Sequence, residues 1–188
     1  VLQINTVYGE GSTGLIAKAI HDLCADHQIQ CISAHRCVRK GNPPLEDSVS
    51  ISSKWDSRLH GLLSRFTMFK GAGSVIKTAR FLKQVSLYAP DVIHLHNLHG
   101  SYINLPLLFR YIKKHNIPVV WTLHDCWPFT GSEQHMQSGS TRYIQGYTDK
   151  NKEHSGIDFD RILFQRKEHL WRDLPIHFIA PSHWIGNC

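Results

Sequence analysis

The sequence predicts an α/β domain built on a parallel sheet with helices on both faces. Short apolar runs alternate along the chain with longer stretches whose apolar residues recur at helical spacing. Strands that alternate with helices in this way normally pair parallel, because each helix returns the chain to the same end of the sheet. The chain has 188 residues, 41% of them hydrophobic and 19% charged, which suits one folded domain with a sizeable core.

The first half of the chain is expected to open with a strand over residues 1–7, followed by a helix over 13–27 and a second strand over 29–34. Residues 41–53 hold a Pro-Pro pair and several serines, so we expect a loop there. Residues 54–66 form an amphipathic helix in this interpretation. Its apolar residues line one side and its basic residues lie largely off that side: Trp55, Leu59, Leu62, Leu63 and Phe66 against Lys54, Arg58 and Arg65.

The second half is expected to hold three helices, each followed by a strand. Pro90 ends the first of these helices, and Pro106 is tolerable because it falls in a first helical turn. Residues 130–155 are polar and lack periodicity, so they are expected to be irregular. The three helix–strand pairs cover residues 74–88 with 91–95, 104–115 with 117–123, and 159–172 with 176–180.

Composition and charge exclude several classes of protein. The five cysteines are scattered and form no CxxC pair, which argues against a disulfide framework and a zinc site and fits a reducing cytosol. No apolar run approaches the roughly 18–20 residues of a membrane span. The net charge is +6, and basic residues concentrate between Arg36 and Lys83. This asymmetry suits a phosphate-bearing substrate, a membrane surface or nucleic acid, although a solvated basic face would look the same.

A glycine-rich turn follows the first strand, in the sequence NTVYGEGSTG. Its letters match GxGxxG, and the start of the next helix offers free N–H groups to a phosphate. The second strand ends without the acidic residue that would bind an NAD ribose, whereas Arg36 could serve a 2′-phosphate. An NADP-binding oxidoreductase domain is therefore one alternative, and a turn without any ligand is another.

Two further groups of polar residues follow later strands. In DVIHLHNLHG, His94 and His96 share one face of the strand, and we expect His96 to reach the rim and His94 to stay in the core. In WTLHDCWPFTG, an adjacent His-Asp pair and aromatic residues indicate an ordered loop with a polar tip, which is a surface that suits sugars. Ligands of parallel sheets bind at this carboxyl edge. No GxSxG elbow supports a serine hydrolase.

Together with the closing FIAPSHW, these motifs resemble retaining family-4 glycosyltransferases of the GT-B fold, especially those of exopolysaccharide synthesis of the colanic acid type. The resemblance covers nearly the whole chain. It implies that residues 1–180 are the N-terminal, Rossmann-like, three-layer half on the acceptor side. Residues 181–188, from Pro181 and Ser182 on, would start the crossing to a C-terminal donor domain. Residues 1–188 alone are then expected to be inactive.

The resemblance also implies the chemistry: a sugar passes from a nucleotide-sugar donor to a saccharide or lipid-linked saccharide acceptor in polysaccharide biosynthesis. In enzymes of this kind the leaving diphosphate would take the acceptor proton, which would explain why no carboxylate pair at glycosidase-like spacing is seen. No cofactor and no metal are expected. His96 would be the catalytic residue, through a hydrogen bond to the transferred sugar. The other matched residues are Gly9, Gly11 and Ser12 against the donor, and His124, Asp125, Trp127 and His99 along the acceptor cleft.

The chain departs from its relatives after FTG, where they commonly carry several cysteines in a metal-clasped loop and this chain has SEQHM. We therefore expect no metal there. The expected location is cytoplasmic or peripheral on the inner face of the cell membrane, without nucleic acid as a partner. The apolar stripe of residues 54–66 either rests on an anionic bilayer or packs on the domain. A non-catalytic module that binds an anionic surface is the remaining alternative.

Overall fold

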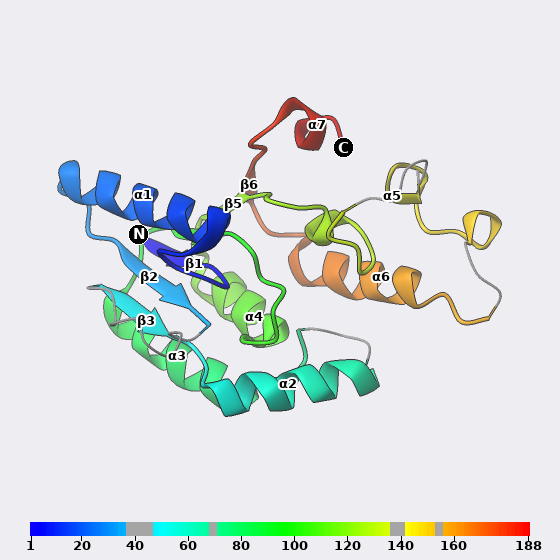
Figure 1. Cartoon of the computed structure of the whole chain (residues 1–188), viewed down its shortest axis with the longest axis horizontal. Coiled ribbons are helices and arrows are strands. Elements are labelled where there is room, and N and C mark those ends of the chain that lie inside the picture. The colour runs from blue at the N-terminus through cyan, green and yellow to red at the C-terminus, as the bar shows by residue number, and fades with distance from the viewer. Residues whose placement is uncertain (37–46, 68–70, 136–141, 153–155) are drawn as a thin grey trace.

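The computed structural model confirms an α/β domain with one parallel sheet (Figure 1). It describes residues 1–36, 47–67, 71–135, 142–152 and 156–188. The six strands are ordered β3-β2-β1-β4-β5-β6, and every neighbouring pair is parallel. The chain moves outward from β1 in one direction and then from β4 in the other, so the topological switch point lies between these two strands. Their bounds are Leu2–Ile4 (β1), Ile32–His35 (β2), Ser48–Ser50 (β3), Ile93–Leu95 (β4), Val119–Thr122 (β5) and Ile176–Ile179 (β6).

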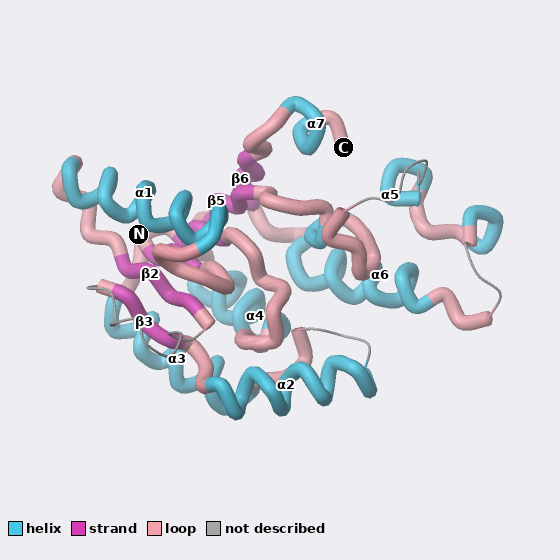
Figure 2. The backbone as a smooth tube through the Cα atoms, in the orientation of Figure 1, coloured by secondary structure: helices cyan, strands magenta, loops and turns pink. Residues whose placement is uncertain are grey.

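The five long helices of the described chain agree with the expected ones to within a few residues. Asn104 precedes α4 and accepts a hydrogen bond from the backbone N–H of Leu107, which explains why that helix begins where it does. The bounds are Gly11–Asp26 (α1), Lys54–Thr67 (α2), Val75–Tyr88 (α3), Leu105–His115 (α4) and Phe159–Trp171 (α6). Short segments are Trp127–Phe129 (η1), Arg142–Gln145 (α5), Asp149–Asn151 (η2) and His183–Gly186 (α7), visible as short coils in Figure 2. No described helix has the length and apolar content to cross a bilayer.

One face of the sheet is apolar and carries the core. Leu2 and Ile4 of β1 point to this face, and so do Ile93 and Leu95, their register partners on β4. Helices α3, α4 and α6 cover it, with Phe81, Val85, Phe109, Ile112 and Leu163 among the buried side chains. Figure 1 shows α3 and α4 on the side of the sheet opposite α1. Burial of this face supplies the hydrophobic stabilisation of the domain.

The other face is polar. Gln3 lies between Leu2 and Ile4 and therefore points the other way, in register with Ser33 on β2 and His94 on β4. The Gln3 amide nitrogen donates to the carbonyl of Ala17 on α1 at 3.0 Å, and His21 of α1 hydrogen-bonds the Ser33 hydroxyl at 3.1 Å. Helix α1 thus covers this face through hydrogen bonds, although sheets of this kind usually pack apolar residues on both faces.

Two stretches differ from expectation. Residues 41–53 were expected to be a loop, yet Ser48–Ser50 is strand β3, paired in register with Ser33–His35. A short serine-rich strand at the sheet edge contains no apolar run by which the sequence could reveal it. Its backbone pairing with β2, rather than the packing of apolar side chains, holds it in place. Within the irregular stretch 130–155, the structure has α5 and η2. The buried Arg142 forms an ion pair with Asp158 and lies 4.5 Å from the Tyr147 ring, which ties this region together. Residues 37–46, 136–141 and 153–155 fall outside the described part.

Phe109 tests the role of the apolar face. Its side chain is 2% exposed, and its ring centroid lies 6.0 Å from that of Trp121 and 5.2 Å from that of Trp171. Phe109→Ala should lower the free energy of unfolding by about 3–5 kcal/mol, because it leaves a cavity beneath the sheet. The next residue, Arg110, is exposed, and Arg110→Ala should change the free energy of unfolding by less than about 0.5 kcal/mol. Urea denaturation of both variants measures this; equal effects would contradict the assigned core.

Candidate functional site

The three predicted motifs meet at the carboxyl edge of the sheet, around the switch point between β1 and β4. The loop after β1 is joined to the loop after β4 by the Thr6 hydroxyl, which bonds the carbonyls of Asn97 at 2.9 Å and His99 at 2.7 Å. The backbone N–H of Asn97 donates to the Asn5 side chain at 3.3 Å. The loop after β5 joins them through a contact between His96 and His124. The expected convergence of the three motifs is confirmed.

The glycine turn approaches the start of α1 closely. Gly9 and Gly11 have φ values of 69° and 64°, a conformation that glycine adopts without strain. A Cβ on Gly14 would lie 3.1 Å from the Val7 side chain and 3.3 Å from the Tyr8 nitrogen, so a side chain at position 14 would crowd the turn. Gly11 and Ser12 are exposed in the first turn of the helix. The start of α1 therefore presents accessible backbone at the same edge as the histidines.

His96 is buried rather than placed at the rim, with 1% of its surface exposed. Its Nε2 lies 3.1 Å from Oε1 of Gln3 and its Nδ1 lies 2.9 Å from Nε2 of His124. Strand alternation correctly gave the face of the sheet that His96 occupies. It did not show that the His124 ring, stacked at 5.2 Å between centroids, would lie over it. Its expected contact with a sugar stays a prediction, and both of its ring nitrogens are engaged by protein groups.

The proton positions in this Gln3–His96–His124 chain follow from the Gln3 amide. Its nitrogen donates to Ala17, so its oxygen faces His96 and accepts a proton from Nε2. Nδ1 of the neutral His96 must then accept, and Nε2 of His124 must donate to it. The lone pair of His124 therefore resides on Nδ1, to which no other described residue makes a hydrogen bond. His124 is half-buried, so it is the member of the chain nearest to solvent.

Burial keeps these rings neutral. Desolvation, with smaller contributions from the neighbouring His94 and His124, lowers the pKa of His96 to about 3. Burial lowers the pKa of His124 as well, and the adjacent Asp125 carboxylate opposes that shift. His94 is buried as expected, with its Nε2 at 2.8 Å from the Thr122 hydroxyl, and burial lowers its pKa to about 4. At neutral pH the array offers hydrogen-bonding imidazoles and no positive charge.

A second pair, His99 and Asp125, lies beside the first. His99 Nε2 is 2.6 Å from Asp125 Oδ2, and the Gln134 amide donates to His99 Nδ1 at 3.0 Å. The other Asp125 oxygen accepts from the backbone N–H of Trp127 at 3.0 Å. Each of these bonds fixes a side chain of the loop after β5. Asp125 and His99 are partly exposed, so they remain available at the edge of the site.

Trp127 does not line an open surface, although the sequence suggested that it would. It is 3% exposed, and the ammonium group of Lys167 lies 4.3 Å from its ring and donates to its carbonyl oxygen. The indole therefore packs beneath the loop and is not available to stack on a sugar. Sequence reasoning also missed Lys167, which is 1% exposed; a lysine on an amphipathic helix gives no sign that it will be buried under a tryptophan.

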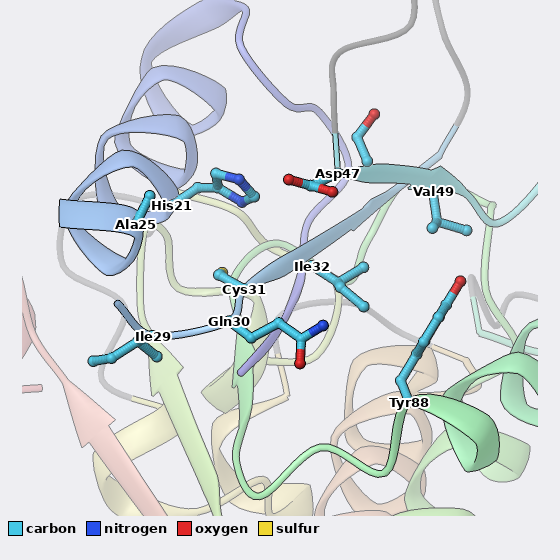
Figure 3. A pocket seen from close by; sticks show the side chains of 10 residues that line it. His21, Ala25, Ile29, Gln30, Cys31, Ile32, Asp47, Val49 and Tyr88 are labelled. Atoms are coloured by element: carbon cyan, nitrogen blue, oxygen red, sulfur yellow. The ribbon is translucent and has the colours of Figure 1, made fainter. Parts of the chain in front are cut away.

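A recess on the described part of the surface lies away from these groups. It has a volume of about 520 Å³ and lies between α1, the starts of β2 and β3, and Tyr88 (Figure 3). Because its strand residues are the first of their strands, it opens at the amino edge of the sheet, opposite the histidines. Ligands of parallel sheets bind at the carboxyl edge, so we do not assign the chemistry to this recess. No group of His, Cys, Asp and Glu in the described ranges could hold a metal ion.

Comparison with known proteins places the chain in a family. Residues 16–187 match the model of Glycosyltransferase Family 4, and the chain belongs to this family. The chain is similar to the "Putative colanic acid biosynthesis glycosyl transferase WcaC" of Escherichia coli (strain K12), with 31% identity over 109 residues, which is 52% of this chain and 27% of that protein. The match thus spans about a quarter of the relative. No solved structure matches the chain. The family that the motifs resemble is confirmed.

The lowered histidine pKa values predict acid instability. Unfolded His94 and His96 bind a proton below about pH 6.5, whereas in the folded chain they stay neutral down to about pH 4 and 3. The unfolded state therefore binds more protons, and stability should fall between pH 6.5 and 4 by about 1 kcal/mol per pH unit for each histidine. Urea unfolding at pH 5 to 7 measures this slope. His94→Gln should reduce it by about half, and a free energy that is flat over this range would contradict the assignment.

Proposed function

We propose that this chain is the acceptor-side half of a retaining glycosyltransferase, which transfers a sugar from a nucleotide-sugar donor to a saccharide or lipid-linked saccharide in polysaccharide biosynthesis. One observation carries the proposal: an exposed glycine turn and a neutral histidine array lie together at the switch point of the sheet. Membership of the family and the name of the bacterial relative support it. An oxidoreductase domain and a non-catalytic module have no such support.

The glycine turn is the proposed site of the donor diphosphate. Gly9, Gly11 and Ser12 precede or open α1, and the first N–H groups of a helix have no partner within the helix. Their partial positive charge favours an anion. As the bond to the sugar breaks, negative charge grows on the diphosphate, so the same N–H groups would stabilise the transition state more than the bound donor.

His124 is the group that we propose contacts the sugar hydroxyls. Its Nδ1 carries the lone pair, so it would accept a hydrogen bond from a hydroxyl group, and its low pKa leaves it uncharged to do so. His96 would act through His124, because it holds the ring by the bond between Nδ1 and Nε2. Asp125 and His99 would contact the acceptor on the adjoining side. This proposal replaces the sugar contact expected for His96, whose ring nitrogens bond Gln3 and His124, with a positioning role.

In the proposed mechanism, no side chain of the protein acts as a nucleophile or takes the proton of the acceptor. The acceptor hydroxyl attacks the anomeric carbon on the face that the diphosphate leaves, and a departing phosphate oxygen takes the hydroxyl proton. The configuration is therefore retained without a carboxylate nucleophile at glycosidase spacing. The chain contributes orientation of both sugars and stabilisation of the phosphate charge. No cofactor and no metal enter this scheme.

Part of the proposed enzyme would come from outside these residues. We propose that a C-terminal domain of the same protein closes over the donor and supplies most nucleotide contacts, so that residues 1–188 alone do not turn over. Residues 181–188 would begin the crossing to it. The proposed location is cytoplasmic, with the enzyme peripheral on the inner face of the membrane that holds lipid-linked acceptors.

The proposed activity predicts that nucleotide sugars are substrates of the protein expressed from its full gene. UDP-, GDP-, ADP- and dTDP-linked sugars can be offered with a lipid extract of the source cells, and release of the nucleoside diphosphate measured. One donor should be consumed only when acceptor lipid is present, and the product should keep the anomeric configuration. Inversion of that centre would contradict the proposed mechanism. Thermal stabilisation by NADP, without turnover of any sugar donor, would contradict the function itself.

The Gln3–His96–His124 chain predicts coupled effects on turnover. In the same protein, His124→Ala should lower kcat/KM by about 10- to 100-fold, because a hydrogen bond to a buried hydroxyl is lost. His96→Ala should cause a loss of similar size, and the double variant should be no worse than either single one, since both act through one contact. The exposed His27→Ala serves as the control. Multiplicative losses would mean that His96 acts independently, and normal turnover of His124→Ala would remove its role.

A further inference from the structure

Helix α2 turns its apolar side outward. Trp55 is 78% exposed and Phe66 is 80% exposed, and Leu59 and Leu62 between them are 59% and 51% exposed. Positions 55, 59, 62 and 66 recur at helical spacing, so they form one stripe along the helix. The sequence left open whether this stripe packs on the domain. The structure shows that it does not: the large apolar side chains of the helix face away from the core.

The inner side of α2 is held by polar contacts. His60 is 1% exposed, its Nε2 accepts the backbone N–H of Gly73 at 3.1 Å, and its Nδ1 therefore donates to the Ser74 hydroxyl at 2.9 Å. Ser74 in turn donates to Asp56 at 2.5 Å. A Cβ on Gly73 would come within 2.4 Å of the His60 ring, so the glycine at this position allows α2 to lie close to the segment before α3. These bonds fix the rotation of α2 about its axis, and the outward stripe follows from them.

The outward charge of α2 has one sign. Lys54, Arg58 and Arg65 are exposed, and at 100° per residue they line one flank of the apolar stripe. The guanidinium group of Arg58 lies 5.3 Å from the Trp55 ring. The helix has one acidic residue, Asp56, and its carboxylate bonds Ser74 on the inner side. The exposed surface thus combines an apolar stripe with a positive flank.

The position of α2 relates this surface to the proposed site. The helix begins four residues after Ser50, the last residue of β3, and therefore starts at the carboxyl edge of the sheet, where His96 and His124 also lie. In Figure 1, α2 forms the lower border of the molecule, and no labelled element lies beyond it. The first turn of α2 is thus at the same edge of the sheet as the proposed acceptor site.

We propose that the outward face of α2 binds an anionic lipid bilayer. The helix would lie in the plane of the membrane with Trp55, Leu59, Leu62 and Phe66 among the upper acyl chains and the basic flank at the headgroups. Its 14 residues suit such an orientation and are too few to span. Two copies paired through this face would bring two positive flanks together, which disfavours a dimer. The benefit of this contact, access to a lipid-linked acceptor, rests on the proposed function; the binding itself does not.

Vesicle co-sedimentation of the 188-residue chain tests this surface. The chain should bind vesicles of phosphatidylglycerol and phosphatidylcholine at low salt and should not bind phosphatidylcholine alone. Trp55→Ser with Phe66→Ser should weaken binding by about tenfold or more, because both residues supply apolar contact. Arg58→Gln with Arg65→Gln should weaken it by a similar factor and reduce its dependence on salt.

Matched variants elsewhere on the surface distinguish binding through α2 from non-specific binding to the vesicles. Trp184→Ser with Leu87→Ser removes side chains that are 57% and 81% exposed, and Arg110→Gln with Lys114→Gln removes exposed charge. These variants should bind as the parent does, and all variants should keep its melting temperature. The proposal would be overturned if both sets of variants lost binding equally, or if the parent did not bind anionic vesicles. It would also be overturned if sedimentation showed a dimer that the Trp55 and Phe66 substitutions dissociate. Vesicle binding of this chain, together with a lack of sugar transfer by the protein expressed from its full gene, would overturn the proposed function and leave this inference standing.

Discussion

The architecture of the site depends on one buried carboxamide. Gln3 lies at the centre of the sheet, where an unpaired polar group would cost about 1–3 kcal/mol. Its nitrogen bonds the Ala17 carbonyl of α1 and its oxygen bonds His96. The first bond places α1 over β1, which sets the glycine turn at the carboxyl edge. The second orients His96 and, through it, His124. In the described residues no buried side-chain nitrogen or oxygen lacks a partner.

The two faces of the sheet therefore have different roles. The apolar face packs on α3, α4 and α6 and supplies most of the buried hydrophobic surface. The polar face carries Gln3, His94, His96 and Thr122, whose hydrogen bonds specify orientation more than they add stability. Alternation along single strands separates the faces: Ile93 and Leu95 point to the core while His94 and His96 point to the array. Stability and function can thus be altered separately.

The sequence predicts what depends on local pattern. Helices were located by apolar spacing, and the three motifs by glycines and histidines after apolar strands. The sequence did not predict contacts between residues that are distant in the chain. His96 is covered because His124, in the loop after β5, stacks on it, and Trp127 packs against Lys167, which is 40 residues away in sequence. The outward rotation of α2 depends on Gly73 and Ser74 as partners of His60, and no periodicity within the helix reports them. Strand β3 was missed because backbone pairing alone defines it.

The proton state of the Gln3–His96–His124 chain can be measured directly. Two-bond ¹H–¹⁵N NMR of labelled imidazole rings reports the tautomer and charge of each histidine, and single His→Gln variants assign the signals. We predict that His96 and His124 are neutral at pH 7 with the proton on Nε2. His96 should then stay uncharged down to about pH 4, since burial lowers its pKa to about 3. A proton on Nδ1 of His96, or a His96 ring that titrates near its ordinary value of 6.5, would contradict this prediction.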